Sequence, residues 1–154
     1  MNETNGKSHE TTDGLVEFDA FVLVVEDNPV NLEVAQSMLE FMGCRVDSAQ
    51  NGVEAVEKAA KVPYDLILMD CHMPEMDGFE ATRLIREKEE NGEGGGQRHT
   101  TIIALSGDAD ILESGNYLTA GMDDFLGKPY DIKELCTMMG KWLPRGKMSI
   151  DLTE

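Results

Sequence analysis

The sequence predicts an α/β fold: a doubly wound sheet of five parallel strands in a single three-layer domain. Two observations carry this prediction. Short apolar runs of strand length alternate five times with stretches of helical periodicity. Several of the runs are apolar throughout, which is typical of strands covered by helices on both faces. The length of 154 residues is enough for one such domain with a substantial core.

The first strand is predicted over residues 21–25 and the first helix over residues 29–42. Asn28 followed by Pro29 marks the start of the helix, because Asn caps helix N-termini and Pro fits the first turn. Gly43 marks its end. The next two units follow the same pattern along the chain, with strands at 45–49 and 64–69 and helices at 51–61 and 78–90.

The last two strands are predicted over residues 101–105 and 122–126, with a helix between them over 110–120. That helix is expected to be weak, because Gly115 in its interior costs about 1 kcal/mol relative to Ala. A final helix is predicted to start after Asp131, which is a good N-cap residue.

Composition excludes several classes of function. Thirteen basic and 30 acidic residues give a formal charge of −17. This charge opposes binding to nucleic acid or to anionic membranes, so neither is expected as a partner. It favours cations and basic protein surfaces, or simply solubility. Cys44, Cys71 and Cys136 form no CxxC pair, and they are expected to be reduced residues in or near the core of a cytosolic protein.

The ends of the chain differ in composition from its centre. Residues 1–18 are predicted to be a flexible polar leader or linker, residues 19–144 the folded domain and residues 145–154 a flexible tail. The glycine-rich stretch 88–100 is expected to be a surface insertion. No apolar run has membrane-spanning length.

Polar residues are concentrated where the predicted strands end. Glu26 and Asp27 follow the first strand, Asp70 the third, Ser106 the fourth and Lys128 the fifth. The carboxyl ends of parallel strands lie at one edge of the sheet, where open α/β sheets bind ligands, so these side chains should meet. Three neighbouring carboxylates repel one another unless a cation joins them.

A hard cation with oxygen ligands is therefore predicted at this edge, and Mg²⁺ suits a site with few carboxylates. We expect Asp27, Asp70 and the backbone carbonyl of Cys71 to be ligands, with Glu26 helping directly or through water. Mn²⁺ can substitute. One oxygen of Asp70 is then left to act as a nucleophile, and Lys128 supplies a positive charge for phosphoryl oxygens. The Ser106 hydroxyl can donate a hydrogen bond to the same group.

At these residues the chain resembles the receiver domain of two-component response regulators. The resemblance covers about residues 21–143, and its quoted parts are VVEDNPVN at 24–31, LILMDCHMPEMDGFEATRLIR at 66–86, IIALSG at 102–107 and AGMDDFLGKP at 120–129. The second of these is most similar to receivers attached to hybrid histidine kinases. The resemblance implies a flavodoxin-like sheet with strand order 2-1-3-4-5.

The resemblance also implies a role for each matching residue. Asp70 is implied as the phosphoacceptor, and Glu26 and Asp27 as the acidic pair that holds the metal. Lys128 matches the invariant lysine position of the family. Further implied roles are the hydroxyl and aromatic switch for Ser106 and Phe125, and tuning of dephosphorylation for His72 and Asp108.

The function implied is signalling rather than enzymatic. A histidine kinase or histidine phosphotransfer domain would donate a phosphoryl group to Asp70, and the domain would assist its own phosphorylation and slow dephosphorylation. A downstream protein would then bind the face formed by the fourth helix, fifth strand and fifth helix. The expected location is cytoplasmic, either as a separate regulator or as the cytoplasmic part of a membrane-bound hybrid kinase.

Two other functions fit parts of the sequence. One is a protein-interaction module that keeps only the fold; the complete set of acidic, hydroxyl and lysine positions argues against it. The other is a metal-dependent phosphatase of the haloacid dehalogenase type. Such enzymes need a second acid two residues after the nucleophile, and that position is His72 here.

Overall fold

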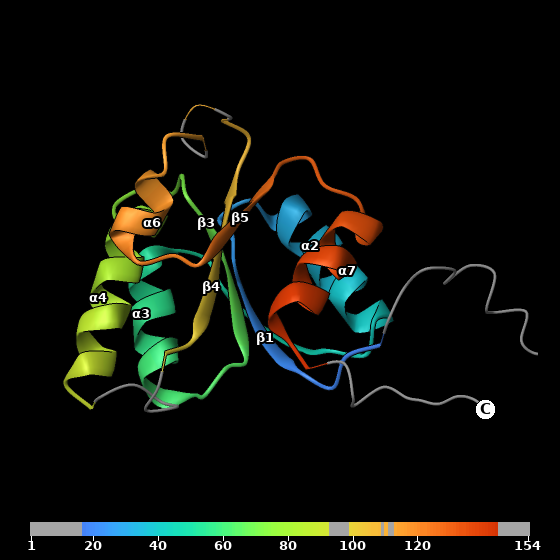
Figure 1. Cartoon of the computed structure of the whole chain (residues 1–154), viewed down its shortest axis with the longest axis horizontal. Helices are drawn as coiled ribbons and strands as arrows, with labels where there is room; N and C mark the ends of the chain where they lie inside the picture. The colour runs from blue at the N-terminus through green and yellow to red at the C-terminus, as the bar shows by residue number, and fades with distance from the viewer. Residues whose placement is uncertain (1–16, 93–98, 109, 111–112, 145–154) are drawn as a thin grey trace, which may run out of the picture.

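The computed structural model describes residues 17–92, 99–108, 110 and 113–144. Its five parallel strands form one sheet in the order β2-β1-β3-β4-β5, which confirms the predicted fold class and strand order (Figure 1). The strands are β1 (Phe21–Val25), β2 (Arg45–Ala49), β3 (Leu66–Asp70), β4 (Thr101–Ser106) and β5 (Asp124–Gly127).

Helices cover both faces of this sheet. Helices α2 (Pro29–Phe41) and α7 (Ile132–Trp142) lie on one face, and α3 (Gly52–Lys61), α4 (Gly78–Glu90) and α6 (Asn116–Ala120) lie on the other (Figure 1). Successive strand residues point to opposite faces, so Val22 and Val24 enter one core and Leu23 and Val25 the other. This double burial explains why β1 is apolar along its length.

Local capping residues fix the ends of these helices. The Asn28 side chain accepts the N–H groups of Val30 and Asn31 at 2.9 and 3.0 Å, as its position predicted. Asp131 forms a capping box with Glu134 at the start of α7. These caps set where the loops at the carboxyl edge of the sheet become helix.

The predicted helix 110–120 is not continuous. Asp110 and Glu113 are helical, but Ser114 and Gly115 form a turn before α6 begins at Asn116. Gly115 has a φ of +80°, a left-handed conformation that ends one helical segment and starts the next. The interior glycine therefore breaks the helix as well as weakening it. Residues 109, 111 and 112 lie outside the described part of the chain.

The predicted fifth strand, 122–126, was placed two residues too early at its start. The N–H of Met122 donates to the carbonyl of Tyr117 at 2.9 Å and so belongs to the C-terminal cap of α6. Gly121, with a φ of +105°, makes this cap possible. Asp123 is the first residue of this segment to bond β4, through its N–H to the Ile102 carbonyl at 2.8 Å.

The proposed tail and most of the proposed leader, residues 145–154 and 1–16, lie outside the described residues, as does the central part of the glycine-rich insertion, residues 93–98. Residues 88–90 of that insertion belong to helix α4. Two residues assigned to the leader, Glu17 and Phe18, are described. Phe18 is buried, and its N–H donates to the Met42 carbonyl at 2.8 Å. Packing therefore begins at or before Phe18.

The three cysteines are free and buried, and burial raises the pKa of Cys44 and of Cys71 to about 12. Thiols with such pKa values are unreactive at neutral pH. Within the described ranges, every helix falls short of the length and hydrophobicity of a bilayer-spanning segment.

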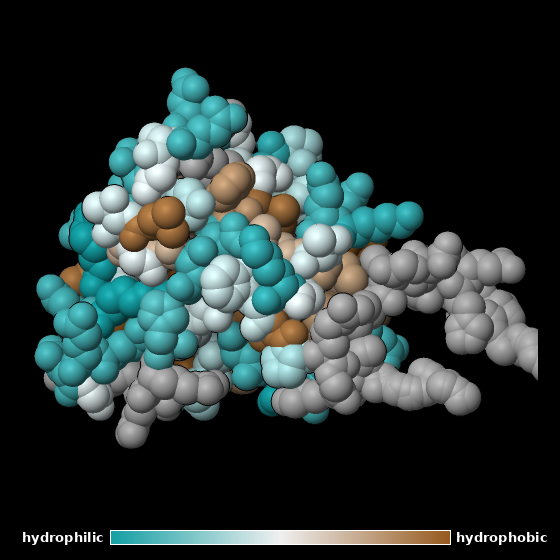
Figure 2. Space-filling model, viewed as in Figure 1, coloured by the Kyte–Doolittle hydropathy of each residue, from teal (hydrophilic) through white to brown (hydrophobic). Residues whose placement is uncertain are grey.

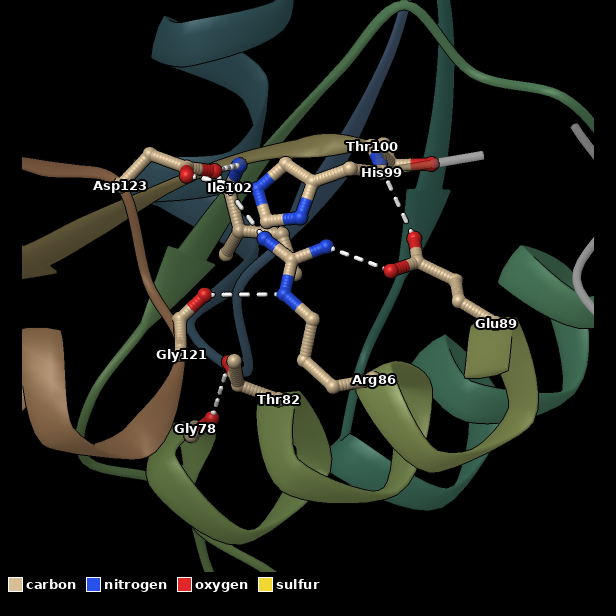
Figure 3. Close-up of polar contacts among 9 residues, drawn as sticks. All are labelled: Gly78, Thr82, Arg86, Glu89, His99, Thr100, Ile102, Gly121 and Asp123. Atoms are coloured by element: carbon tan, nitrogen blue, oxygen red, sulfur yellow. Dashed lines mark hydrogen bonds and ion pairs between the residues drawn. The ribbon is translucent and has the colours of Figure 1, made fainter. Parts of the chain in front are cut away.

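A polar network joins α4 to the amino-terminal ends of β4 and β5, and Figure 3 shows Arg86 at its centre. The Arg86 Nε donates to the Gly121 carbonyl at 2.9 Å, and its terminal nitrogens pair with Glu89 at 2.8 Å and Asp123 at 3.0 Å. Asp123 also accepts the N–H of Ile102 at 2.8 Å. This network fixes the edge of the sheet opposite to the strand carboxyl ends.

Candidate functional site

The polar residues predicted to meet at the carboxyl edge of the sheet do lie there. Asp70 and Ser106 are the last residues of β3 and β4. Glu26 directly follows β1, and Lys128 directly follows β5. The backbone also links the neighbouring strands, because the N–H of Lys128 donates to the Ser106 carbonyl at 2.8 Å.

Three carboxylates form a compact cluster. Oxygen atoms of Glu26, Asp27 and Asp70 all lie within 4.8 Å of one another. Glu26 and Asp70 are only 3% and 4% exposed, whereas Asp27 is exposed. Burial makes the repulsion among these charges costly, and oxygen ligands on a partly open site suit a hard divalent cation. The donor set therefore fits Mg²⁺.

The carbonyl of Cys71, the predicted fourth ligand, accepts the N–H of Gly78 at 3.2 Å. A carbonyl oxygen has two lone pairs, so this hydrogen bond leaves one for a cation. The Cys71 side chain is buried and does not take part in the cluster of acids.

Lys128 bridges two of the buried acids. Its Nζ lies 2.9 Å from Glu26 Oε1 and 3.4 Å from Asp70 Oδ2. Burial opposes the positive charge, but the hydrogen bond to Glu26 and the charge of Asp70 raise the pKa of the lysine above its usual value. The Lys128–Pro129 peptide bond is cis.

Burial raises the pKa of Asp70 to about 6, and the charge of Glu26 adds to the rise. The N–H of His72, which donates to Asp70 Oδ1 at 3.2 Å, and the charge of Lys128 act in the opposite direction. The single ammonium group therefore does not offset the combined cost of burial and repulsion at Asp70. An added cation would relieve both.

The remaining predicted residues differ in depth. Ser106 is 1% exposed, and its Oγ accepts the N–H of Asp108 at 2.9 Å. Phe125 is half-buried and packs edge-on against Tyr117 of α6, with ring centroids 5.2 Å apart. The His72 and Asp108 side chains belong to exposed residues of the loops that follow β3 and β4.

Sequence reasoning missed Tyr130 and the backbone donors of the site. Burial and the charges of Glu26 and Asp70 raise the pKa of Tyr130 to about 12. The N–H groups of His72 and Asn28 bind Asp70 and Glu26. Backbone donors carry no residue-type signal, so only coordinates reveal them. Tyr130 follows the Lys128–Pro129 pair directly, and this adjacency was the available clue.

A cavity of about 270 Å³ opens beside the cluster, between α2 and the loop that follows β5. Lys128 and Glu26 form its polar part. Its apolar walls include Val34 and Met38 of α2, with Pro129 and Tyr130 opposite. The buried charges are thus reached from a surface that is partly apolar.

Comparison with known proteins agrees with this geometry. The family profile described as "Response regulator receiver domain" matches residues 22–140. The chain is 45% identical over 125 residues to hybrid signal transduction histidine kinase B of Dictyostelium discoideum, covering 78% of this chain and 6% of the kinase. It is 40% identical over 124 residues to sensor histidine kinase GacS of Pseudomonas protegens, covering 79% of this chain and 13% of the kinase. The chain thus spans only a small part of the kinases that it matches.

Two solved structures are also similar. The receiver domain of sensor histidine kinase PA1611 from Pseudomonas aeruginosa, with magnesium coordinated in its active-site cleft, matches with a TM-score of 0.71 and 41% identity over 81% of this chain and 98% of that one. The receiver domain of the response regulator Ssk1, in complex with the histidine phosphotransfer protein Ypd1 of Saccharomyces cerevisiae, matches with a TM-score of 0.74 and 30% identity, covering 82% of this chain and 90% of that one. The chain therefore belongs to the response regulator receiver domains of two-component and phosphorelay signalling.

Proposed function

We propose that this receiver domain takes a phosphoryl group onto Asp70 from a phosphohistidine of a partner kinase or histidine phosphotransfer domain. An Asp70 oxygen attacks phosphorus, the P–N bond breaks with its electron pair returning to the imidazole, and an acyl phosphate forms. Water later hydrolyses it to the carboxylate and inorganic phosphate. The observation that most supports this is the placement of Lys128 Nζ 3.4 Å from Asp70 Oδ2, beside the acidic cluster.

Asp27, Asp70 and the Cys71 carbonyl are the proposed ligands of Mg²⁺, or of Mn²⁺ in its place. The two Glu26 oxygens already accept hydrogen bonds from Lys128 and from the N–H of Asn28, which favours a role for Glu26 through water. A bound cation would reduce the repulsion among the acids and neutralise charge on the transferring group.

Ser106 and Lys128 are the proposed donors to the phosphoryl oxygens. The Ser106 Oγ accepts the N–H of Asp108, so its own proton can be donated to a phosphoryl oxygen. His72 and Asp108 flank the site in exposed loops, and we propose that their side chains tune the rate at which water attacks the acyl phosphate.

The surface around the cavity is the proposed docking site for the phosphohistidine donor. Val30 and Val34 of α2 are 66% and 48% exposed, and Val34 lines the cavity beside Lys128. A helical partner that packs on this apolar strip would bring its histidine to the open side of Asp70. We propose a cytoplasmic location, as a separate regulator or as part of a hybrid kinase such as the relatives that this chain matches.

A second surface, formed by α6, β5 and α7, is the proposed output face. Figure 2 shows hydrophobic side chains among hydrophilic ones on this face, and Leu118 and Trp142 are 58% and 36% exposed there. Phosphorylation would move Ser106 and turn the ring of Phe125, which contacts Tyr117 of α6.

Hydrogen exchange is expected to detect this change. Adding a phosphoryl mimic to the Mg²⁺-bound protein should alter protection within residues 106–130, because α6 is a short helix next to a glycine turn. Protection over β1 and α2 serves as the internal reference. Identical exchange across 106–130 in both states would contradict the proposed output face.

Acetyl phosphate tests the proposed function directly. With Mg²⁺, the intact protein should gain the mass of one phosphoryl group, and both chelation of the metal and Asp70→Ala should prevent this. Glu57→Gln, which removes an exposed acid on α3, should leave the gain unchanged. No gain in the wild type would favour a fold-only interaction module. Rapid repeated hydrolysis of a phosphomonoester would favour the phosphatase.

Asp27→Asn is expected to separate the two effects of the acidic cluster on stability: repulsion among the charges without metal, and stabilisation by bound Mg²⁺. Without metal the variant should be more stable than the wild type, because one of three mutually repelling charges is removed. At about 100 times its Kd, Mg²⁺ should stabilise the wild type by about 2.7 kcal/mol and the variant by far less. Thermal unfolding with and without Mg²⁺ measures both. Glu33→Gln, an exposed acid on α2, should behave as wild type.

A further inference from the structure

The first residue of α4 lies directly against the backbone of the phosphoacceptor. Gly78 is buried, and its N–H donates to the Cys71 carbonyl at 3.2 Å. A Cβ added to Gly78 would lie 2.2 Å from the carbonyl oxygen of Asp70 and 2.9 Å from Cγ of Met69. Such distances are far below van der Waals contact. Any side chain at Gly78 would therefore displace the end of β3 or the start of α4.

Position 78 requires glycine because a side chain has no space there, and not because of its backbone conformation. Positive φ angles occur at Gly43, Gly92, Gly115 and Gly121, where a left-handed backbone favours glycine. Gly78 is not among them, and it is the first residue of a regular helix whose N-cap is Asp77. An alanine would fit its dihedral angles. The three atoms nearest to such a Cβ all belong to the strand that carries Asp70.

The contact of Gly78 with the end of β3 affects the positions of two groups of the site, the Asp70 side chain and the Cys71 carbonyl. Asp70 is the last residue of β3, so a shift of its carbonyl also shifts its side chain relative to Lys128. The Gly78 N–H holds the carbonyl of Cys71, the proposed metal ligand. Thr82 supports the same turn, because its buried hydroxyl donates to the Gly78 carbonyl at 2.8 Å (Figure 3).

We propose that Gly78 is a positioning residue: its missing side chain lets α4 seat on β3, and this seating fixes Asp70 and the Cys71 carbonyl for metal binding. This proposal rests on the proposed function, since it concerns the geometry of the same site. It predicts that a single methyl group at Gly78 damages metal binding more than it damages the fold.

Gly52 offers a matched control. It is the first residue of α3 and is buried, and a Cβ there would lie 2.6 Å from the Met76 carbonyl oxygen and 2.9 Å from the Met76 Cγ. Gly52→Ala therefore introduces the same kind of conflict, a Cβ against a carbonyl oxygen, but at a carbonyl of the loop between β3 and α4 that lies outside the metal site. If Gly78→Ala weakened Mg²⁺ binding only by destabilising the fold, Gly52→Ala should weaken it to a similar extent.

The experiment compares Gly78→Ala and Gly52→Ala in the full chain by Mg²⁺ titration calorimetry and thermal unfolding, with acetyl phosphate as a further readout. We expect Gly78→Ala to weaken Mg²⁺ binding by about 10–100-fold, as loss of groups that orient metal ligands does, and Gly52→Ala to stay within about twofold of wild type. Wild-type affinity in Gly78→Ala, or equal losses in both variants, would overturn the proposal.

Two further outcomes of this experiment also test the proposal. If Gly78→Ala does not fold, Thr82→Val replaces it, since it removes the hydroxyl bond to Gly78 at nearly constant shape. A loss of at least about threefold in Mg²⁺ affinity then supports the proposal, and an unchanged affinity overturns it. If the wild type binds Mg²⁺ but takes no phosphoryl group, the proposed function fails while the effect of Gly78 on metal binding is still measured.

Discussion

Lys128→Met is expected to slow phosphorylation of Asp70 by about 10²–10³-fold, the usual cost of removing a preorganised charge at a reacting group. The lysine is the ammonium group placed between Glu26 and Asp70, at 2.9 and 3.4 Å. Its side chain is only 23% exposed, so water replaces its charge poorly. Methionine keeps much of the length and packing of the side chain and removes the charge.

The same variant should change the titration of Asp70 in Mg²⁺-free buffer. Burial raises the pKa of Asp70 to about 6, and the charge of Lys128 lowers it from what it would otherwise be. Removing that charge should therefore raise the pKa further, and the carboxylate should form only at higher pH. Carbon NMR of the Asp70 carboxyl group measures this shift alongside the phosphorylation rate.

Lys141→Met is the matched control. Lys141 also pairs with a buried aspartate, Asp124, at 2.8 Å, but it lies on α7 away from the acidic cluster and is 62% exposed. Lys141→Met should alter neither the rate of phosphorylation nor the pKa of Asp70. A wild-type rate in Lys128→Met, or equal slowing in Lys141→Met, would show that the lysine is not the relevant charge.

Arg86→Met is expected to lower the free energy of unfolding by about 3 kcal/mol, the usual cost of leaving buried charges without their partner. Arg86, Glu89 and Asp123 are 14%, 10% and 16% exposed at their side chains. The variant removes the positive charge beside both carboxylates and the donor to the Gly121 carbonyl. Glu89 keeps its bond from the Thr100 N–H, and Asp123 keeps the Ile102 N–H and the contact with His99. Denaturant unfolding at neutral pH measures the loss.

Two comparisons make this result specific. Arg83→Met, at an exposed position of the same helix, should change stability by less than about 0.5 kcal/mol. Adding Asp123→Asn to Arg86→Met should recover part of the loss, because one of the two carboxylate charges is gone. Equal destabilisation by both single arginine substitutions would mean that helix α4, and not the network, accounts for the effect.

The arrangement of the site followed from a simple rule about strands. Glu26, Asp70, Ser106 and Lys128 are found together because each ends or follows a parallel strand, and a local apolar pattern is enough to locate those ends. The chemical roles assigned to these residues stay predictions.

The sequence could not predict features that depend on where tertiary contacts place the backbone. The N–H groups of His72 and Asn28 bind the acids whatever their side chains are, and the contact of Gly78 with Asp70 requires two elements to be positioned first. The break at Gly115 was missed for a related reason. A glycine inside a helical pattern signals a cost, but the neighbouring contacts decide whether the helix bends, weakens or stops.

The Arg86 network also holds the two ends of α6 unequally. Gly121, at the C-terminal end of α6, is tied to α4 by a hydrogen bond of 2.9 Å, and Asp123 is tied to both α4 and β4. At the other end of α6, Gly115 is a left-handed turn with open space around it. If phosphorylation displaces Ser106, as proposed, we therefore expect the displacement of α6 to be largest near Gly115 and smallest at Gly121.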